Sequence, residues 1–240
     1  MALYRIADLN CNIKFRYDFA ADRAKDYYEG EDIPNADICI EATDDDFNRY
    51  IDTFKRDDCL HQFEYVIVGN KFNRQILRFN GVMFHSSCVV VDDTAYLFSA
   101  DSGTGKSTHT ALWLKLFGDR AYILNDDKPI IRLTDSGLYA YGTPFSGKTE
   151  LNRNKKVKIG GICFLERAKE NTIQSISAGT ALPLFMRQTI NQVDKCELDT
   201  LLNVTDKLLT NVKLYKLGCN MDISAARLSY EVMSKGCANG

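Results

Sequence analysis

The stretch 100–108 combines glycines, a lysine and hydroxyl side chains at a spacing that suits phosphate binding. Ala100 replaces the first glycine of the pattern G-x-x-x-x-G-K-[ST]. The residues in place are Gly103, Gly105, Lys106 and Ser107. Backbone N–H groups of such a loop can converge on one anion, and the helix that starts behind it adds the positive end of its dipole. The sequence therefore predicts a site for nucleotide phosphates, in preference to a glycine-rich hairpin that happens to end in Lys-Ser.

The pattern predicts which side chains of this loop contact a bound nucleotide. We expect Lys106 to reach the outer phosphates and the Ser107 hydroxyl to coordinate a magnesium ion. The amides of residues 102–107 would cradle the β-phosphate. The residues of this stretch that we expect to contact the nucleotide are Asp101, Ser102, Gly103, Thr104, Gly105, Lys106, Ser107 and Thr108. A nucleotide and Mg²⁺ are therefore the expected ligands of this loop.

A pair of carboxylates follows the next apolar run of the chain. Residues 121–125 read as a strand, and Asp126 and Asp127 come directly after it. Such carboxylates emerge at the carboxyl end of the strand, beside the phosphates, where a metal ion and an incoming hydroxyl must be handled. We therefore expect Asp127, together with Asp126 and Ser107, to hold the metal. The alternative is a strand that stops in a polar turn before Pro129.

A second loop carries a locally basic patch. Residues 143–150 include Gly147-Lys148, and Arg153 lies in the basic run 152–156 that follows. This patch would clamp phosphate or an acidic acceptor, with Lys148 and Arg153 offsetting charge on a transferred group. The alternative is an exposed loop with no role in the site.

Strands and helices alternate after residue 80, which predicts an α/β core with a mixed sheet. A strand at 96–99 and a helix at 108–117 flank the phosphate loop, and Gly118 stands where that helix should end. The other strands expected in this part lie within 82–91, at 159–165, at 212–217 and in a hairpin over 130–141. The other helices are expected at 178–187, 198–209 and 223–233.

The sequence of residues 1–80 predicts an α+β region that packs on this core. The segments that read as strands here are 4–17 (a strand or hairpin), 37–41, 65–68 and 74–79, the last two joined by Gly69-Asn70. Residues 44–55 are expected to be helical, with Asp44, Asp45 and Asp46 at the helix N-terminus rather than at a metal site. We therefore divide the chain into this region and a nucleotide-binding catalytic domain, 81–240.

Composition and charge exclude several classes of partner. With 240 residues and a formal net charge of −2, the chain has no basic surface that recommends nucleic acid. No apolar run approaches the length of a membrane span, and residues 1–5 have no signal-peptide h-region behind them. We therefore expect a cytoplasmic protein without a membrane partner, in which a homo-oligomer is possible. The eight cysteines form no C-x-x-C motif and read as buried free thiols.

The stretch from His85 to Asp127 resembles the catalytic core of HPr kinase/phosphorylase, a bacterial serine kinase. That core shares its fold with ATP-dependent phosphoenolpyruvate carboxykinase. The family has a His-containing strand, then G-D-S-G-x-G-K-S, then a strand that ends in A-D-D. The corresponding residues here are His85, the run A-D-S-G-T-G-K-S at 100–107, and N-D-D at 125–127. The carboxykinases share G-T-G-K but normally have an apolar residue in place of Asp101. The resemblance implies a phosphoenolpyruvate carboxykinase/HPr kinase-like P-loop core.

The resemblance also implies roles for single residues. Asp126 matches the carboxylate that takes the proton from the acceptor hydroxyl, and Asp127 matches its partner near the metal. His85 matches the strand histidine beside the phosphates. The family's glycine-rich signature loop, E-I-R-G-x-G, is absent from the sequence. Glu150 and Arg153 of the second loop are the candidates to stand in for its acid and its arginine.

The residues and the resemblance together predict an ATP-dependent kinase that transfers the γ-phosphoryl group to a serine-type hydroxyl on a small molecule, peptide or protein. The expected catalytic residues are Asp126, His85, Lys106 and Arg153. One alternative is a nucleotide-binding or sensor module without catalysis. Another is carboxykinase-like chemistry on a small carboxylic acid, which would need a second metal site with His and Lys ligands. The region before residue 80 does not resemble the family's separate N-terminal domain, which leaves the acceptor open.

Overall fold

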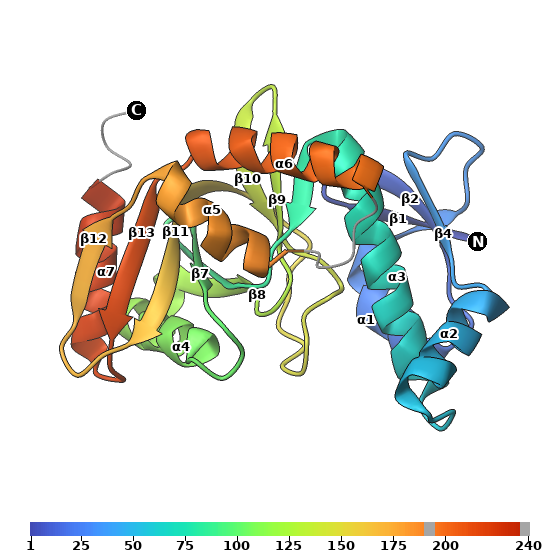
Figure 1. Ribbon diagram of the computed structural model, residues 1–240, viewed down its shortest axis with the longest axis horizontal. Coiled ribbons are helices and arrows are strands. Elements are labelled where there is room, and N and C mark those ends of the chain that lie inside the picture. The colour runs from blue at the N-terminus through green and yellow to red at the C-terminus, as the bar shows by residue number, and fades with distance from the viewer. Residues whose placement is uncertain (190–194, 236–240) are drawn as a thin grey trace.

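Two β-sheets organise the computed structural model, which describes residues 1–189 and 195–235 (Figure 1). The strands of the smaller sheet are β1 (Ala2–Ile6), β2 (Leu9–Lys14), β3 (Tyr28–Glu31) and β4 (Ile38–Glu41). The strands of the larger sheet are β5 (Gly81–Met83), β6 (Ser87–Val91), β7 (Thr94–Ser99), β8 (Ala121–Asn125), β9 (Ile130–Thr134), β10 (Gly137–Tyr141), β11 (Lys156–Arg167), β12 (Thr172–Ser175) and β13 (Leu214–Cys219). The fold is therefore mixed α/β.

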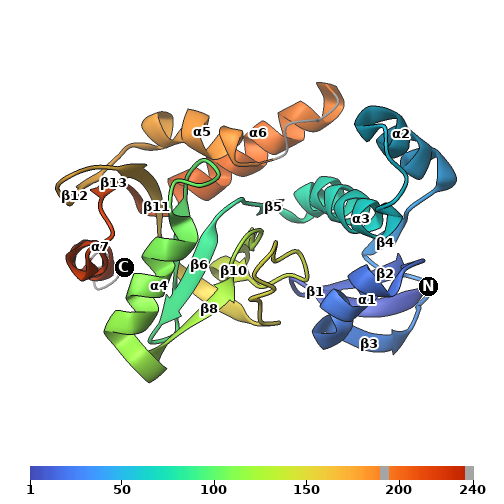
Figure 2. The same ribbon diagram turned by 90° about the horizontal axis from the view of Figure 1, so that it is seen from below.

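Helices connect and cover these sheets. The α-helices are α1 (Asp18–Ala24), α2 (Asp44–Phe54), α3 (Leu60–Ile76), α4 (Lys106–Phe117), α5 (Ala178–Arg187), α6 (Lys195–Thr210) and α7 (Ile223–Lys235). Short 3-10 helices are η1 (Lys25–Tyr27), η2 (Leu77–Phe79) and η3 (Gly118–Arg120). Figure 2 shows the molecule turned by 90°, with the smaller sheet at one end and α7 at the other.

Alternating side chains along β7 show how helices cover the larger sheet. Ala95 and Leu97 pack in one core with α5 and α6. Tyr96 and Phe98 pack in another core with α4 and α7. Successive side chains of a strand point to opposite faces, so helices cover both faces of the sheet, as Figure 1 also shows. Burial on both faces explains why β6 and β7 are almost continuously apolar.

The order of the central strands brings three segments of the chain to one edge of the sheet. β6 lies between β7 and β8 and is antiparallel to both. β7 and β8 therefore run in the same direction, and β6 begins at the edge where they end. The loop after β7, the carboxylates after β8 and His85 just before β6 consequently meet at this edge.

The smaller sheet shares a core with the larger one through α3. Val68, Phe72 and Ile76, each one helical turn apart, are buried against the smaller sheet. The same core includes Met83 and Phe145, which belong to the larger unit. Figures 1 and 2 both show α3 beside the smaller sheet and leading into β5 of the larger one. Residues 1–80 are thus attached to the rest of the chain by a continuous apolar core.

One sequence-based prediction is wrong, because residues 65–68 and 74–79 are not strands but parts of α3 and η2. Gly69 does not turn the chain. A Cβ at this position would lie 3.2 Å from Cδ1 of Phe145, so glycine lets α3 pack closely on that ring. Apolar residues of this helix enter two different cores. Because they occupy more than one side of the helix, the helical period is masked in the sequence.

The other predicted elements are largely confirmed. α4 ends at Phe117, and Gly118 follows with a φ of 55°. α2 begins behind a capping box formed by Thr43 and Asp46, so the three aspartates there mark a helix N-terminus. The confirmed elements also include the hairpin over 130–141 and the helices over 178–187, 198–209 and 223–233.

Two predictions from composition can be compared with the described residues. No helix within 1–189 and 195–235 has the length and apolar character needed to cross a bilayer. The buried free thiols in these ranges are Cys11, Cys59, Cys88 and Cys163, as predicted, whereas Cys39 is exposed and Cys219 is half-buried. The side chains of Cys196 and Cys237 lie outside the described residues.

Substitution of Gly142 tests how closely the backbone before the second loop packs on the backbone after it. A Cβ at Gly142 would lie 1.8 Å from the carbonyl oxygen of Arg153. Gly142→Ala should therefore push two backbone segments apart and lower the free energy of unfolding by about 3 kcal/mol or more, the upper end of overpacking effects. Urea unfolding measures this change.

The matched control for this substitution is Gly179→Ala. Gly179 lies in α5, and the nearest atom to an added Cβ there is Ser177 Oγ at 3.9 Å. This control should be neutral or slightly stabilising, because alanine favours a helix over glycine. Equal stability of Gly142→Ala and the wild-type chain would contradict the prediction.

Candidate active site

The loop after β7 turns through two glycines with positive φ. Gly103 and Gly105 adopt φ values of 77° and 122°, which residues with a Cβ rarely reach. α4 begins at Lys106, and the amide of His109 donates to the carbonyl of Gly105 at 2.8 Å. The amides of the first turn of α4 have no acceptor within the helix. They are therefore available to an anion at the helix N-terminus.

Lys106 is buried beneath this loop. Its Nζ donates to the carbonyl oxygen of Ala100 at 2.9 Å, and its relative exposure is 8%. Burial lowers the pKa of Lys106, while the carboxylates of Asp127, Asp126 and Asp101 act to raise it. The structure therefore brings the lysine of the loop and the two carboxylates after β8 into electrostatic contact.

Asp126 is held by the hydroxyl group of Ser87, which in turn contacts Thr110. Ser87 Oγ, at the start of β6, donates to Asp126 Oδ1 at 2.5 Å. The same hydroxyl lies 2.9 Å from Thr110 Oγ1, one turn into α4 beyond Lys106. All three side chains are buried. The network fixes the rotamer of the Asp126 carboxylate relative to the helix that follows the loop.

Asp127 lies next to His85 and Lys128. Asp127 Oδ1 is 3.2 Å from His85 Nε2, and Oδ2 pairs with the ammonium group of Lys128. Burial alone would raise the pKa of Asp127, but the hydrogen bond from His85 and the charge of Lys128 outweigh it and the pKa is lowered. Asp127 is therefore a carboxylate at neutral pH.

The second loop packs against Asp127 through its glycine. A Cβ at Gly147, where φ is 65°, would lie 2.9 Å from Cβ of Asp127. Lys148 follows and is exposed. The guanidinium group of Arg153 lies 4.5 Å from the ring centroid of Tyr122, on β8 before the carboxylate pair. The loop thus brings its backbone to Asp127, while Arg153 stacks on an aromatic ring at the other end of β8.

Glu150 of the second loop forms an ion pair with α1 and not with the residues around the phosphate loop. It pairs with Arg23 of α1 at 2.8 Å, and Arg23 donates to the carbonyl oxygen of Gly147 at 2.7 Å. Tyr27 OH donates to Asn152 Oδ1 at 2.8 Å. Residues from the first eighty therefore fasten the loop that covers Asp127.

Sequence reasoning missed several residues of the site. Ser87 bonds Asp126 and is itself bonded by Thr110, and Gln188 bonds both Asp101 and His85. These residues carry no local motif, and Gln188 lies 87 residues from Asp101. The hydroxyl at position 87 could have been found only by pairing β6 with β8, since that pairing aligns the start of one with the end of the other.

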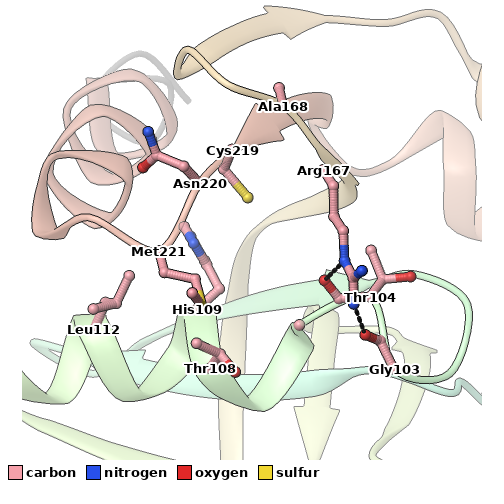
Figure 3. Close-up of a pocket in the computed structure, with 11 residues that line it drawn as sticks. Gly103, Thr104, Thr108, His109, Leu112, Arg167, Ala168, Cys219, Asn220 and Met221 are labelled. Carbon is pink, nitrogen blue, oxygen red and sulfur yellow. Dashed lines mark hydrogen bonds between the residues drawn. The ribbon is translucent and has the colours of Figure 1, made fainter.

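A cavity of about 440 Å³ opens beside the loop (Figure 3). It lies between the loop, the start of α4, the end of β11 and the connection from β13 to α7. Arg167 Nη2 donates to the carbonyl oxygen of Gly103 at 2.6 Å, which ties the end of β11 to the loop. Leu112, Cys219 and Met221 give the cavity apolar surface. Its size and mixed lining are typical of a small-molecule pocket.

His109 lines this cavity and is 2% exposed. Its Nε2 lies 3.2 Å from both Trp113 Nε1 and Ser229 Oγ. Its Nδ1 has no hydrogen-bond partner among the described residues. Burial lowers the pKa of His109 to about 4. The ring is therefore neutral at pH 7.

The donor atoms at the strand edge suit magnesium better than zinc. Within residues 1–189 and 195–235, no three His, Cys, Asp or Glu side chains gather as metal ligands. Mg²⁺ is usually held by one or two carboxylates together with waters and substrate phosphates. Asp126 and Asp127, with the hydroxyl of Ser107 at the start of α4, fit that pattern.

The depressed pKa of His109 predicts a pH-dependent stability. Between pH 6.5 and about 4 the unfolded chain binds a proton at this residue that the folded chain does not. The free energy of unfolding should therefore fall as the pH is lowered through this window, by up to about 3 kcal/mol. Urea unfolding of the wild type and of His109→Gln at pH 7 and pH 5 measures the effect.

The substituted chain should lose most of this pH dependence, and His61→Gln on α3 is the matched control that should keep it. A slope that is the same in wild type and His109→Gln would show that another group is responsible.

Comparisons with known proteins find a distant structural similarity and no sequence match. No protein-family model matches the chain, and no curated protein matches it. Among solved structures, it is similar to the Hpr(Ser) kinase/phosphatase from Coxiella burnetii, with a TM-score of 0.36 and 9% sequence identity. The match covers 65% of this chain and 95% of that chain. A TM-score of 0.36 marks a distant similarity only.

Proposed function

We propose that this chain is an ATP-dependent phosphotransferase that moves the γ-phosphoryl group of ATP to a hydroxyl group of a small molecule, peptide or protein. The observation that carries the proposal is the convergence of Lys106 with Asp126 and Asp127 beneath one glycine-rich loop. Phosphoryl transfer depends mainly on positioning and on neutralising charge. A buried ammonium group, two carboxylates and a set of helix-terminal amides are the groups that this chemistry needs.

The loop and Lys106 would bind the phosphates. The amides of residues 102–107 would surround the β-phosphate, and Lys106 would exchange the carbonyl of Ala100 for a phosphate oxygen. That exchange replaces a neutral acceptor by an anionic one, which strengthens the hydrogen bond. Burial increases the gain further, because the effective dielectric constant near Lys106 is low.

Asp127, Asp126 and Ser107 would hold a magnesium ion. When bound, this ion would neutralise charge that develops on the phosphate oxygens. The lowered pKa of Asp127 supports this role, because the carboxylate stays ionised at neutral pH. Lys148, exposed on the loop beside Asp127, would offset charge on the transferred group. Arg153 would first have to leave the ring of Tyr122 to do the same.

Asp126 would act as the general base. Ser87 occupies its Oδ1, so Oδ2 would accept the hydrogen bond of the acceptor hydroxyl. A base must lie within hydrogen-bond reach of the proton that it takes. The Ser87–Thr110 network supports this assignment, since it holds the carboxylate in one orientation beside the loop. His85, in contact with Asp127, would complete the polar edge of the site.

The cavity beside the loop would take the purine base of the nucleotide. Leu112 and Met221 offer apolar surface for the faces of a ring, and Thr108 and Asn220 offer polar groups for its edge. Because Arg167 joins this cavity to Gly103, the base and the phosphates would be bound by one connected unit.

Calorimetric titration tests the proposal directly. The purified chain should bind ATP and ADP more tightly with Mg²⁺ than without it, and GTP titrations give the base preference. Incubation with γ-labelled ATP and pools of peptides and metabolites would then identify the acceptor. Binding without transfer to any acceptor or to water would favour a nucleotide-binding module, and no binding would refute the proposal.

Lys106→Ala should abolish most turnover while the fold is kept. Its ammonium group is expected to supply a buried, charge-assisted hydrogen bond to the phosphates, whose loss should cost at least about tenfold in affinity for Mg·ATP. Calorimetry and phosphate release measure the two effects. Lys115→Ala, an exposed position on the same helix, is the control and should behave like the wild type. Unchanged affinity in Lys106→Ala would remove the lysine from the site.

Asp126→Asn should keep nucleotide binding and lower the transfer rate by roughly two to four orders of magnitude, as expected for removal of a general base. The amide can still accept from Ser87, so the fold should be retained. Single-turnover transfer from γ-labelled ATP measures the rate, with Asp119→Asn on η3 as the exposed control. A fully active Asp126→Asn chain would show that the base is a different group.

A further inference from the structure

A chain of side-chain contacts joins the phosphate loop to the carboxylate pair, and Gln188 is its middle member. Gln188 Nε2 donates to Asp101 Oδ1 at 2.9 Å. Gln188 Oε1 lies 2.9 Å from His85 Nδ1, and His85 Nε2 lies 3.2 Å from Asp127 Oδ1. The contacts therefore run from the loop after β7, through the end of α5, to the segment after β8.

The Asp101 end sets the direction of these hydrogen bonds. A carboxylate only accepts, so Gln188 must turn its NH₂ group to Asp101 and its carbonyl oxygen to His85. His85 must then donate from Nδ1 to Gln188, and because the Asp127 carboxylate also only accepts, the second contact is satisfied when Nε2 carries a proton as well. If the amide were reversed, its oxygen would face the Asp101 carboxylate and its NH₂ group would face the Nδ1–H of His85. Only one orientation of Gln188 satisfies both neighbours.

The backbone and an aromatic stack hold Gln188 in register with His85. The amide of His85 donates to the carbonyl oxygen of Gln188 at 2.8 Å, and the amide of Gln188 donates to Phe185 at 3.0 Å. The ring of Phe185 stacks on Phe84, the residue before His85, with centroids 4.4 Å apart. Gln188 is 9% exposed. The orientation of the Gln188 side chain is therefore set by its protein neighbours and not by water.

We propose that Gln188 is a positioning residue for phosphoryl transfer. It orients the His85 ring toward Asp127, and it makes that orientation depend on Asp101 of the phosphate loop. The inference rests on the proposed function, because its value to catalysis comes from fixing the Asp127 carboxylate beside the phosphates. A misplacement of such a group by about 1 Å is enough to slow a reaction that depends on positioning.

The first test observes His85 without nucleotide. The chain has three histidines, so a long-range ¹H–¹⁵N spectrum at fixed pH contains few signals, which His61→Gln and His109→Gln assign. Gln188→Leu should shift the Nδ1 and Nε2 signals of His85. Gln174→Leu, exposed on β12, is the matched control and should leave them in place. Unchanged His85 signals in Gln188→Leu would overturn the inference, whatever the nucleotide experiments give.

The second test exchanges donor and acceptor between positions 101 and 188. Gln188→Glu alone places two carboxylates against each other and should lower kcat for Mg·ATP turnover about tenfold or more, with little change in KM. In the Asp101→Asn background the asparagine amide can donate to the new carboxylate. The same Gln188→Glu substitution should then cost less than about threefold.

The outcomes separate this inference from the proposed function. Equal costs of Gln188→Glu in the two backgrounds would overturn the positioning role while leaving a functioning kinase. A wild-type chain that neither binds nor turns over Mg·ATP would refute the kinase proposal and, with it, a role for Gln188 in catalysis. Rescue by the double substitution would also exclude misfolding as the cause of the loss in Gln188→Glu.

Discussion

The candidate site depends on the position of β6, antiparallel between β7 and β8. Because backbone pairing fixes the directions of these strands, the loop that follows β7 and the carboxylates that follow β8 end at the same edge. His85, just before β6, and Ser87, its first residue, fill the gap between them. Each of these residues then bonds one carboxylate, His85 with Asp127 and Ser87 with Asp126. A sheet with β7 and β8 in direct contact would have no place for either residue.

The electrostatics of the edge follow from that geometry. Lys106 is buried, which disfavours its charge, but three carboxylates stand close enough to oppose this effect. A buried charge without such partners would be costly. The same low dielectric environment strengthens any interaction that the ammonium group makes with a phosphate. The charges of the site are therefore mutually dependent, and loss of one alters the others.

The smaller sheet has a structural connection to this edge through the second loop. Arg23 lies with its guanidinium group 4.6 Å from the ring centroid of Phe19 and bonds both Gly147 and Glu150. The glycine in turn packs directly on Asp127. Residues 1–80 therefore help to fix the loop that covers the carboxylate, and changes in that region can affect the site without touching it.

The sequence by itself was enough to predict the strand, loop and helix from 96 to 117, because glycine positions, a lysine and a helix start are local signals. It also predicted that Asp126 and Asp127 follow a strand. It failed for α3, whose apolar residues serve two cores, and it said nothing of Ser87 or Gln188. Those residues become part of the site only when β6 pairs with its neighbours and α5 packs on Phe84. Tertiary structure alone decided these contacts, since they join segments that no local pattern relates.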